Sequence, residues 1–287
     1  NAEMENVSCL ETTATNANFT LANMQRAKFL GSNLSGSNLD SANLRKSIFL
    51  EANLSKCNLN EADLSNSDFS RTDMSHATIV ESNLSRGRFN GANLESVDFT
   101  DSRLSMAVFF EANFKNANLN RAQVKGAKLA GGTFENTSLP RADITGADLT
   151  DAKFLNSNLS RAKLNGAILR RTDLKGSDLS EADLSIADLT GASLIEVKLI
   201  GANMERIKLN QAKLPGAQLC GAKINKAKLA QVDLSKADLS GANLTGADLT
   251  ESNLQDCDLS RANLTEAILQ KANLKSTFLI GANLQKA

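Results

Sequence analysis

The sequence contains no tryptophan and no tyrosine, and only two prolines and one histidine among its 287 residues. Its four cysteines, Cys9, Cys57, Cys220 and Cys257, have neither the density nor the paired spacing of a disulfide framework or a zinc site. We therefore expect a reducing compartment, with the cytoplasm as the simplest choice. A removed targeting segment and secretion both stay open.

Net charge and long apolar runs are also missing. The 32 basic and 32 acidic residues cancel, so the chain lacks the overall field that recruits nucleic acid or an acidic membrane, and we expect neither partner. The longest apolar run covers residues 106–110. A membrane helix needs about 20 such residues, so we expect no membrane span.

Catalytic constellations are equally scarce. No Ser-His-Asp or Cys-His set with convergent geometry can be assembled around the single histidine, His76, and no phosphate-binding loop or metal motif interrupts the chain. The abundant aspartates, such as Asp183 and Asp188, recur because a repeat recurs. We expect no enzyme activity, no cofactor, no metal site and no small-molecule substrate.

What the sequence does contain is one period. Every fifth residue from Phe19 to Leu284 is apolar, which makes 54 positions: 37 Leu, 10 Phe, 3 Met, 3 Ile and one Val. Two places earlier, 33 of the 54 residues are Ala, and the place between is Asn or Asp in 32. A period of five fits neither a helix nor a plain strand. A small and a large residue two places apart do point the same way in an extended segment.

Glycine and proline locate a turn in each repeat. Fifteen of the 17 glycines stand two places after the large apolar residue, and both prolines, Pro140 and Pro215, stand one place after it. A type II turn favours proline at its second residue and glycine at its third. Many repeats carry a charged residue in the glycine place, so we expect some of the turns to be of another type.

With its A(N/D)LXX units, as in "ADLSGANLTGADLT" at residues 237–250, the chain resembles the pentapeptide-repeat proteins. The resemblance implies an all-β fold, a right-handed, four-sided parallel β-helix with 20 residues per coil. The chain would then form about 13 to 14 coils without long insertions. Phenylalanines at steps of 20 support that coil length independently and predict two core ladders: Phe29, Phe49, Phe69, Phe89 and Phe109, then Phe114, Phe134 and Phe154.

The repeat predicts two segments. Residues 1–16 are less regular, with Cys9 and Ala14 at places for large apolar residues, and we expect a degenerate N-terminal coil or cap there. Residues 17–287 form the uninterrupted repeat region. Because the chain opens at Asn1 and ends inside a repeat, we expect it to be part of a longer protein.

The outward positions carry the candidate contact residues. The register places several apolar side chains outside on one face: Leu30, Ile48, Leu50, Val108 and Phe110. At another corner Arg121, Arg141 and Arg161 follow at steps of 20. Stacked like charges are unfavourable, so this column is either a screened surface pattern or a contact strip for an acidic partner.

Three functions fit this pattern. We expect first a non-catalytic rigid rod that acts as a scaffold or structural element and binds a protein partner, or associates with itself end to end or along the apolar face. Some relatives mimic DNA and regulate or protect DNA gyrase, which the resemblance makes an alternative. The third is a secreted bacterial effector.

Overall fold

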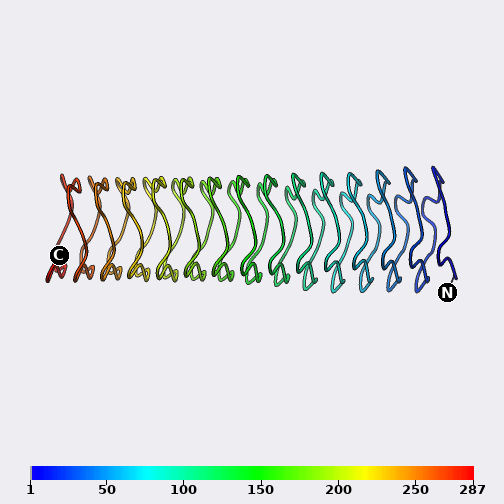
Figure 1. Ribbon diagram of the computed structural model, residues 1–287, viewed down its shortest axis with the longest axis horizontal. Coiled ribbons are helices and arrows are strands. Elements are labelled where there is room, and N and C mark those ends of the chain that lie inside the picture. The colour runs from blue at the N-terminus through cyan, green and yellow to red at the C-terminus, as the bar shows by residue number, and fades with distance from the viewer. Residues whose placement is uncertain (1) are drawn as a thin grey trace. The chain divides into compact units, whose positions relative to one another are not determined.

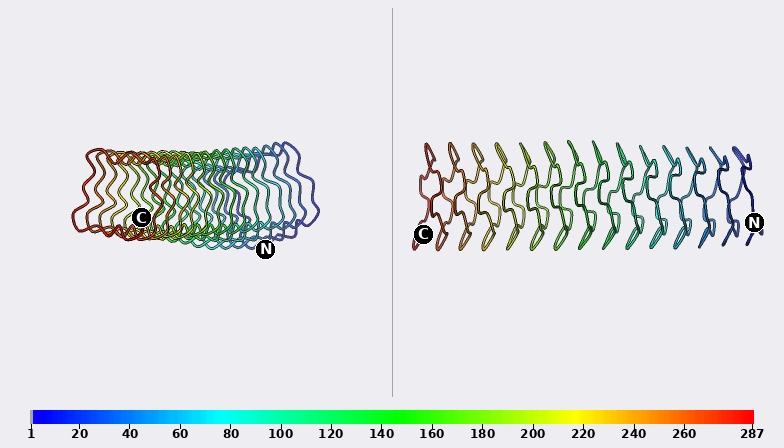
Figure 2. Two further views of the ribbon diagram at one scale, coloured as in Figure 1. Left: turned by 60° about the vertical axis from the view of Figure 1, so that its left-hand side comes forward. Right: turned by 45° about the horizontal axis from the view of Figure 1, so that its top comes forward.

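The computed structural model describes residues 2–287, and the chain divides into two compact units, Asn1–Ala147 and Asp148–Ala287. Each unit is a right-handed, four-sided parallel β-helix whose coils stack on one another (Figure 1). Figure 2 shows this stacking from two further directions. Residues 2–287 contain no helix that is long and apolar enough to cross a membrane.

The strands are reduced to single parallel bridges, one in each pentapeptide. In the first unit they run from Glu3↔Asn23 to Gln123↔Asp143, and in the second from Asp148↔Ile168 to Asn263↔Asn283. Each bridge joins residues 20 apart, so a coil has 20 residues, as the phenylalanine spacing predicts. The bridge of Glu3 belongs to the same series, which means that residues 2–16 already follow the backbone pattern of the later coils.

Backbone hydrogen bonds between coils take up three of the five N–H groups of each repeat. In one repeat of the first unit, the N–H of Leu44 donates to the carbonyl of Asp63 (2.8 Å) and that of Lys46 to the carbonyl of Ser65 (3.1 Å). The N–H of Asn43 donates in the other direction, to the preceding coil (2.9 Å). The coils are therefore joined on both sides at every repeat, which leaves two N–H groups to be satisfied.

Those two groups are satisfied within the repeat. The N–H of Ser47 closes the turn on the carbonyl of Leu44 (3.2 Å), and the N–H of Arg45 binds the side-chain Oδ1 of Asn43 (3.3 Å). The second bond needs a short side chain with an acceptor oxygen two places before the donor, which is what Asn and Asp provide. This requirement explains why Asn and Asp dominate that place of the repeat.

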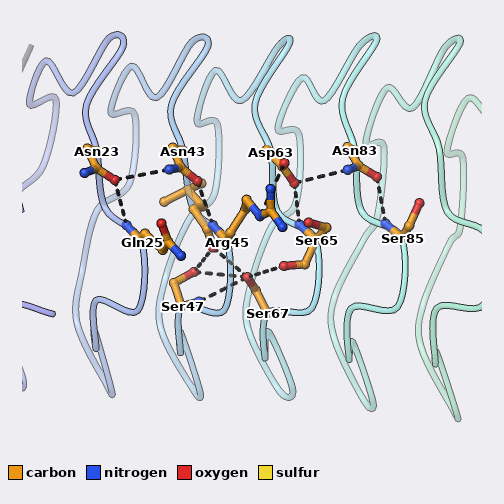
Figure 3. A network of polar contacts seen from close by, with 11 residues as sticks. Asn23, Gln25, Asn43, Arg45, Ser47, Asp63, Ser65, Ser67, Asn83 and Ser85 are labelled. Carbon is orange, nitrogen blue, oxygen red and sulfur yellow. Dashed lines mark hydrogen bonds and ion pairs between the residues drawn. The ribbon is translucent and has the colours of Figure 1, made fainter. Parts of the chain in front are cut away.

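The same side chains connect neighbouring coils. Asn43 donates its Nδ2 to Oδ1 of Asn23 (3.1 Å), and Asn83 donates in the same way to Asp63 (3.2 Å), as Figure 3 shows. One oxygen thus accepts both the turn N–H and an amide of the next coil. The Asn and Asp columns add hydrogen bonds between side chains to those between backbones.

All the turns share one backbone conformation at the glycine place. Fifteen glycines there have φ between 61° and 70°, and the other residues at that place, including Lys46 and Ile186, have φ between 50° and 61°. The expectation that turns without glycine adopt another conformation is therefore wrong for this angle. The N–H of the residue at that place bonds to the next coil, so stacking imposes the positive φ even on residues that disfavour it.

Phenylalanine rings form continuous stacks inside the first unit. Along the first ladder, successive ring centroids lie 5.0, 4.9, 5.2 and 4.8 Å apart, and Phe114 stacks on Phe134 at 4.6 Å. Phe109 and Phe114 connect the two ladders at 5.2 Å with tilted rings. Phe154, in the second unit, is buried. Within the first unit, successive rings of a ladder thus fill successive coils and contact one another.

The small inward position also carries polar atoms. The hydroxyl of Ser67 donates to the carbonyl of Leu44 in the preceding coil (2.6 Å) and accepts the N–H of Ser47 (3.2 Å), so it enters the turn of that coil (Figure 3). The thiols of Cys57 and Cys257 occupy the same place in their repeats and donate to carbonyls 23 residues earlier. Burial raises the pKa of both thiols to about 11.

Substitution at Asp63 tests the turn cap. Replacing Asp63 by Ala removes the acceptor of the Ser65 N–H (2.9 Å) and of the Asn83 amide. We expect a loss of about 1 kcal/mol in the free energy of unfolding, measured by chemical denaturation. Asp63→Asn keeps the oxygen, as Asn43 does one coil earlier, and should cost far less. Equal losses for the two variants would show that the cap does not stabilise the turn.

Thiol reactivity tests the burial of the small column. Because the raised pKa keeps Cys57 and Cys257 protonated at pH 8, we expect Ellman's reagent to modify exposed Cys220 first and half-buried Cys9 next in the native protein. Cys57 and Cys257 should react only after denaturation. The stability that these neutral thiols contribute should fall as the pH rises from 9.0 towards about 11. Four thiols that react at one rate in the native protein would contradict the buried column.

Candidate functional site

An apolar strip occupies one corner of the first unit. The leucine strip consists of Leu10, Leu30 and Leu50. Each is the second residue of the same turn in successive coils and directly follows an inward side chain. Leu10 is 59% exposed, whereas Leu30 and Leu50 are half-buried. Such a position points each side chain outward while the 20-residue step places it next to its equivalents in adjacent coils.

The leucine strip borders a shallow depression of about 260 Å³ with an acidic rim. Its remaining lining residues are Glu11, Gly31 and Glu51. Gly31 has a φ of 61°, and a Cβ atom there would contact the side chain of Glu11 at 3.7 Å, so the glycine keeps the depression open. Glu51 pairs with Arg71 (2.8 Å), whereas Glu11 forms no ion pair with any residue of the described range 2–287.

Ile48, Val108 and Phe110 do not extend the strip into one face. Ile48 is half-buried beside Leu50, and Val108 and 44%-exposed Phe110 lie three coils further along the same columns. The two intervening coils carry polar side chains at these places, which are Asp68, Ser70, Arg88 and Asn90. The expectation of one apolar face is therefore corrected to two separate patches.

Two of the three predicted arginines pair with acidic neighbours. In the first unit Arg121 binds Asp101 of the preceding coil through two hydrogen bonds, one of them 2.7 Å long, and these hold the pKa of Asp101 below its usual range. In the second unit Arg161 binds Glu181 with distances of 2.9 and 3.0 Å. Arg141 forms no ion pair with the residues that the structure describes. Arg121 and Arg161 thus each bind a carboxylate instead of facing a like charge.

The predicted contact residues do not converge on one site. Corners follow one another every five residues along the coil, and the leucine strip stands ten residues from the corner of Arg121 and Arg141. In a four-sided coil ten residues lead to the opposite corner. Within the first unit the apolar and arginine candidates therefore lie on opposite edges, and only the leucine strip is associated with a depression.

A second depression was missed by the sequence reasoning. The serine–arginine hollow, of about 530 Å³, lies in the first unit and is lined by Ser65, Ser85, Ser105, Arg86, Arg103 and Met106, with two asparagines at its border. Three serines at steps of 20 are its signal in the sequence. The signal is weak because serine is common outside the repeat core.

Metal chemistry has no cluster to support it. Among residues 2–287 no group of three histidine, cysteine, aspartate or glutamate side chains is arranged to hold a metal ion.

Comparisons with known structures give similar chains from cyanobacteria. HetL, a pentapeptide repeat protein involved in heterocyst differentiation regulation from Nostoc sp. strain PCC 7120, is 31% identical over 79% of this chain and 89% of HetL, with a TM-score of 0.34. Rfr23 from Cyanothece 51142 is 33% identical over 32% of this chain and 63% of Rfr23, with a TM-score of 0.32.

The plasmid-mediated fluoroquinolone resistance protein QnrB1 is more distant. It is 20% identical over 58% of this chain and 88% of QnrB1, with a TM-score of 0.31. No curated protein matches the chain.

Family models cover almost the whole sequence. The model described as a pentapeptide repeat region matches residues 52–129. The model of eight pentapeptide repeats matches residues 2–40, 117–156, 157–194, 187–225, 221–256 and 257–287. Together with the five-residue repeat of bridges and turns, these matches show that the chain belongs to the pentapeptide repeat family.

Proposed function

We propose that this protein is a non-catalytic scaffold that binds a protein partner through the leucine strip. The observation that carries the proposal is the alignment of three leucines on adjacent coils beside a depression, with Leu10 59% exposed. Aliphatic side chains left in water at a corner gain when a partner covers them. Burial of one leucine contributes about 1.5 to 3 kcal/mol when it is complete, and less where the leucine is already half-buried.

The rim of the depression indicates the chemistry of the partner. Glu11 and Glu51 stand at the corner beside the leucines, and Glu11 has no cation among residues 2–287. A segment that presents aliphatic side chains and a lysine or arginine would complement both features. The fixed spacing of the coils supports binding of an extended segment, because its side chains repeat on a comparable scale.

The electrostatic surface favours the scaffold over DNA mimicry. A mimic needs a continuous acidic stripe. In the first unit the longest acidic run in one column comprises Glu61, Glu81 and Asp101, and it ends at Arg121, which pairs with Asp101. The 32 acidic and 32 basic residues of the whole chain support the same choice.

Introducing negative charges into the leucine strip tests the scaffold proposal. We expect Leu30→Asp plus Leu50→Asp to abolish capture of a protein that the wild type retains from a lysate of its source, measured by affinity capture and mass spectrometry. Two carboxylates in the strip would lose their hydration when the aliphatic side chains of the partner cover them, and this cost opposes binding. Capture of an untagged copy of this chain, tested in parallel, would identify the partner as a second copy.

Phe110→Asp is the matched control. Phe110 occupies the same corner position three coils away and is 44% exposed, but it lies outside the leucine strip. This variant should retain the partner, and circular dichroism should give both variants the melting temperature of the wild type within a few degrees. An identical set of captured proteins for the wild type and the strip variant would eliminate the leucine strip as the contact surface.

A supercoiling assay tests the DNA-mimic alternative directly. Because the described acidic run is short and ends at a paired arginine, we expect DNA gyrase to supercoil relaxed plasmid at an unchanged rate when the protein is added in excess. Protection of gyrase from a fluoroquinolone should also be absent. Inhibition or protection that depends on Glu61 and Glu81 would replace the scaffold by mimicry.

A further inference from the structure

The serine–arginine hollow lies over three adjacent coils of the first unit, at the next corner before that of the leucine strip. Its floor is a column of the three serines Ser65, Ser85 and Ser105, each of which is the second residue of the same turn in successive coils. Three short side chains in one column leave a trough where longer side chains stand in neighbouring coils, such as Arg45 and Lys125. The trough therefore exists because the side chains of one outward column are shorter over three coils than in the coils on either side.

The hydroxyls of Ser65 and Ser85 are not used by the fold, whereas that of Ser105 donates to the carbonyl of Gln123 at 3.5 Å. The backbone N–H groups of Ser65 and Ser85 bind the Oδ1 atoms of Asp63 (2.9 Å) and Asn83 (3.2 Å), and Figure 3 shows these serines one coil apart in the same column. Ser65 is only 5% exposed, yet its hydroxyl has no hydrogen-bond partner among residues 2–287. This hydroxyl opens onto the hollow rather than being sealed from solvent, so it is a donor that a ligand in the hollow can use.

Two arginines border the hollow, and both are free of ion pairs. The guanidinium groups of Arg86 and Arg103 form neither an ion pair nor a hydrogen bond with any residue of the described chain. Arg88, at the bridge position two residues after Arg86, is by contrast paired, with its Nε 3.9 Å from the Asp68 carboxylate. The hollow thus gathers two guanidinium groups, each with several donors in a planar fork, around neutral hydroxyl donors.

Met106 provides an apolar wall at one end. Its side chain lies over Gly126 of the next coil, where a Cβ atom would be only 2.7 Å from the methionine sulfur. Met106 is 58% exposed and can contact carbon atoms of a bound molecule. The volume of about 530 Å³ exceeds that of an isolated tetrahedral anion, so there is room for the group that carries the anion.

We propose that the serine–arginine hollow binds the phosphoryl group of a phosphate monoester. A monoester carries close to two negative charges at pH 7 and three acceptor oxygens, which match the two guanidinium forks and the donors of Ser65 and Ser85. A carboxylate offers one charge and two oxygens and leaves donors unused. The ester could be a free small molecule or a phosphorylated side chain, because the hollow recognises the group that both share. This site is independent of the leucine strip.

Titration calorimetry at one fixed ionic strength tests the proposal, with O-phosphoserine, a short phosphoserine peptide, inorganic phosphate and unmodified serine as ligands. We expect the phosphorylated ligands to bind and serine not to bind. Arg86→Gln and Arg103→Gln should each weaken binding about tenfold, and Ser65→Ala about fivefold. Because the Ser65 hydroxyl has no partner in the fold, Ser65→Ala should keep the melting temperature of the wild type, which separates recognition from a structural effect.

Arg141→Gln is the control, since it removes an unpaired arginine of the same unit at a different corner. It should leave the affinity unchanged. Equal affinities for phosphoserine and the peptide would support recognition of the phosphoryl group alone, and a tighter peptide would support a phosphorylated protein segment as the ligand. An equal loss in Arg141→Gln, or affinities that none of the three hollow variants alters, would overturn the proposal.

Discussion

The hydrogen bonds between coils determine almost everything else in this protein. In each repeat three of the five backbone N–H groups bind the neighbouring coils, as those of Asn43, Leu44 and Lys46 do. These bonds set the distance between coils and place every side chain beside the residues 20 positions before and after it. Turn conformation, core packing and surface pattern are therefore properties of columns rather than of single repeats.

Each column must satisfy a different physical requirement. In the core, phenylalanine rings stack on rings with centroids 5.0 and 4.9 Å apart, so each coil packs against the next. At the bridge position Asn and Asp oxygens accept the turn N–H, so polarity there supports the fold. At the corners charge is the main constraint, and Arg121 avoids its like-charged neighbour by binding Asp101. Because exposed pairs of this kind contribute little to stability, the corners are free to vary and can carry function.

The extent to which the sequence predicts the structure follows from this division. The fold and the Phe29 to Phe109 column are readable because inward positions tolerate few residue types. The turn at Lys46 is not readable from its residue type, because the neighbouring coil rather than the residue imposes its φ. At the surface the register predicts that Leu30 and Leu50 point outward, but it does not predict that they are half-buried, because that depends on contacts between adjacent side chains. The gap between the leucine strip and Phe110 results from the polar residues Asp68, Ser70, Arg88 and Asn90 of the two intervening coils.

A convex surface of identical steps offers no cleft by itself, so a binding site needs a departure from the repeat. The leucine strip departs in polarity, and the serine–arginine hollow departs in side-chain size, with Ser65 left without a partner and Arg86 without an acid among the described residues. Both occur at turn residues, where the backbone is held by neighbouring coils and the side chain contributes little to the fold. Changes there cost little stability, and the rigid ladder beneath keeps the new side chains at a fixed spacing. A protein of this architecture can therefore acquire a site by changing one column over three coils while the core stays the same.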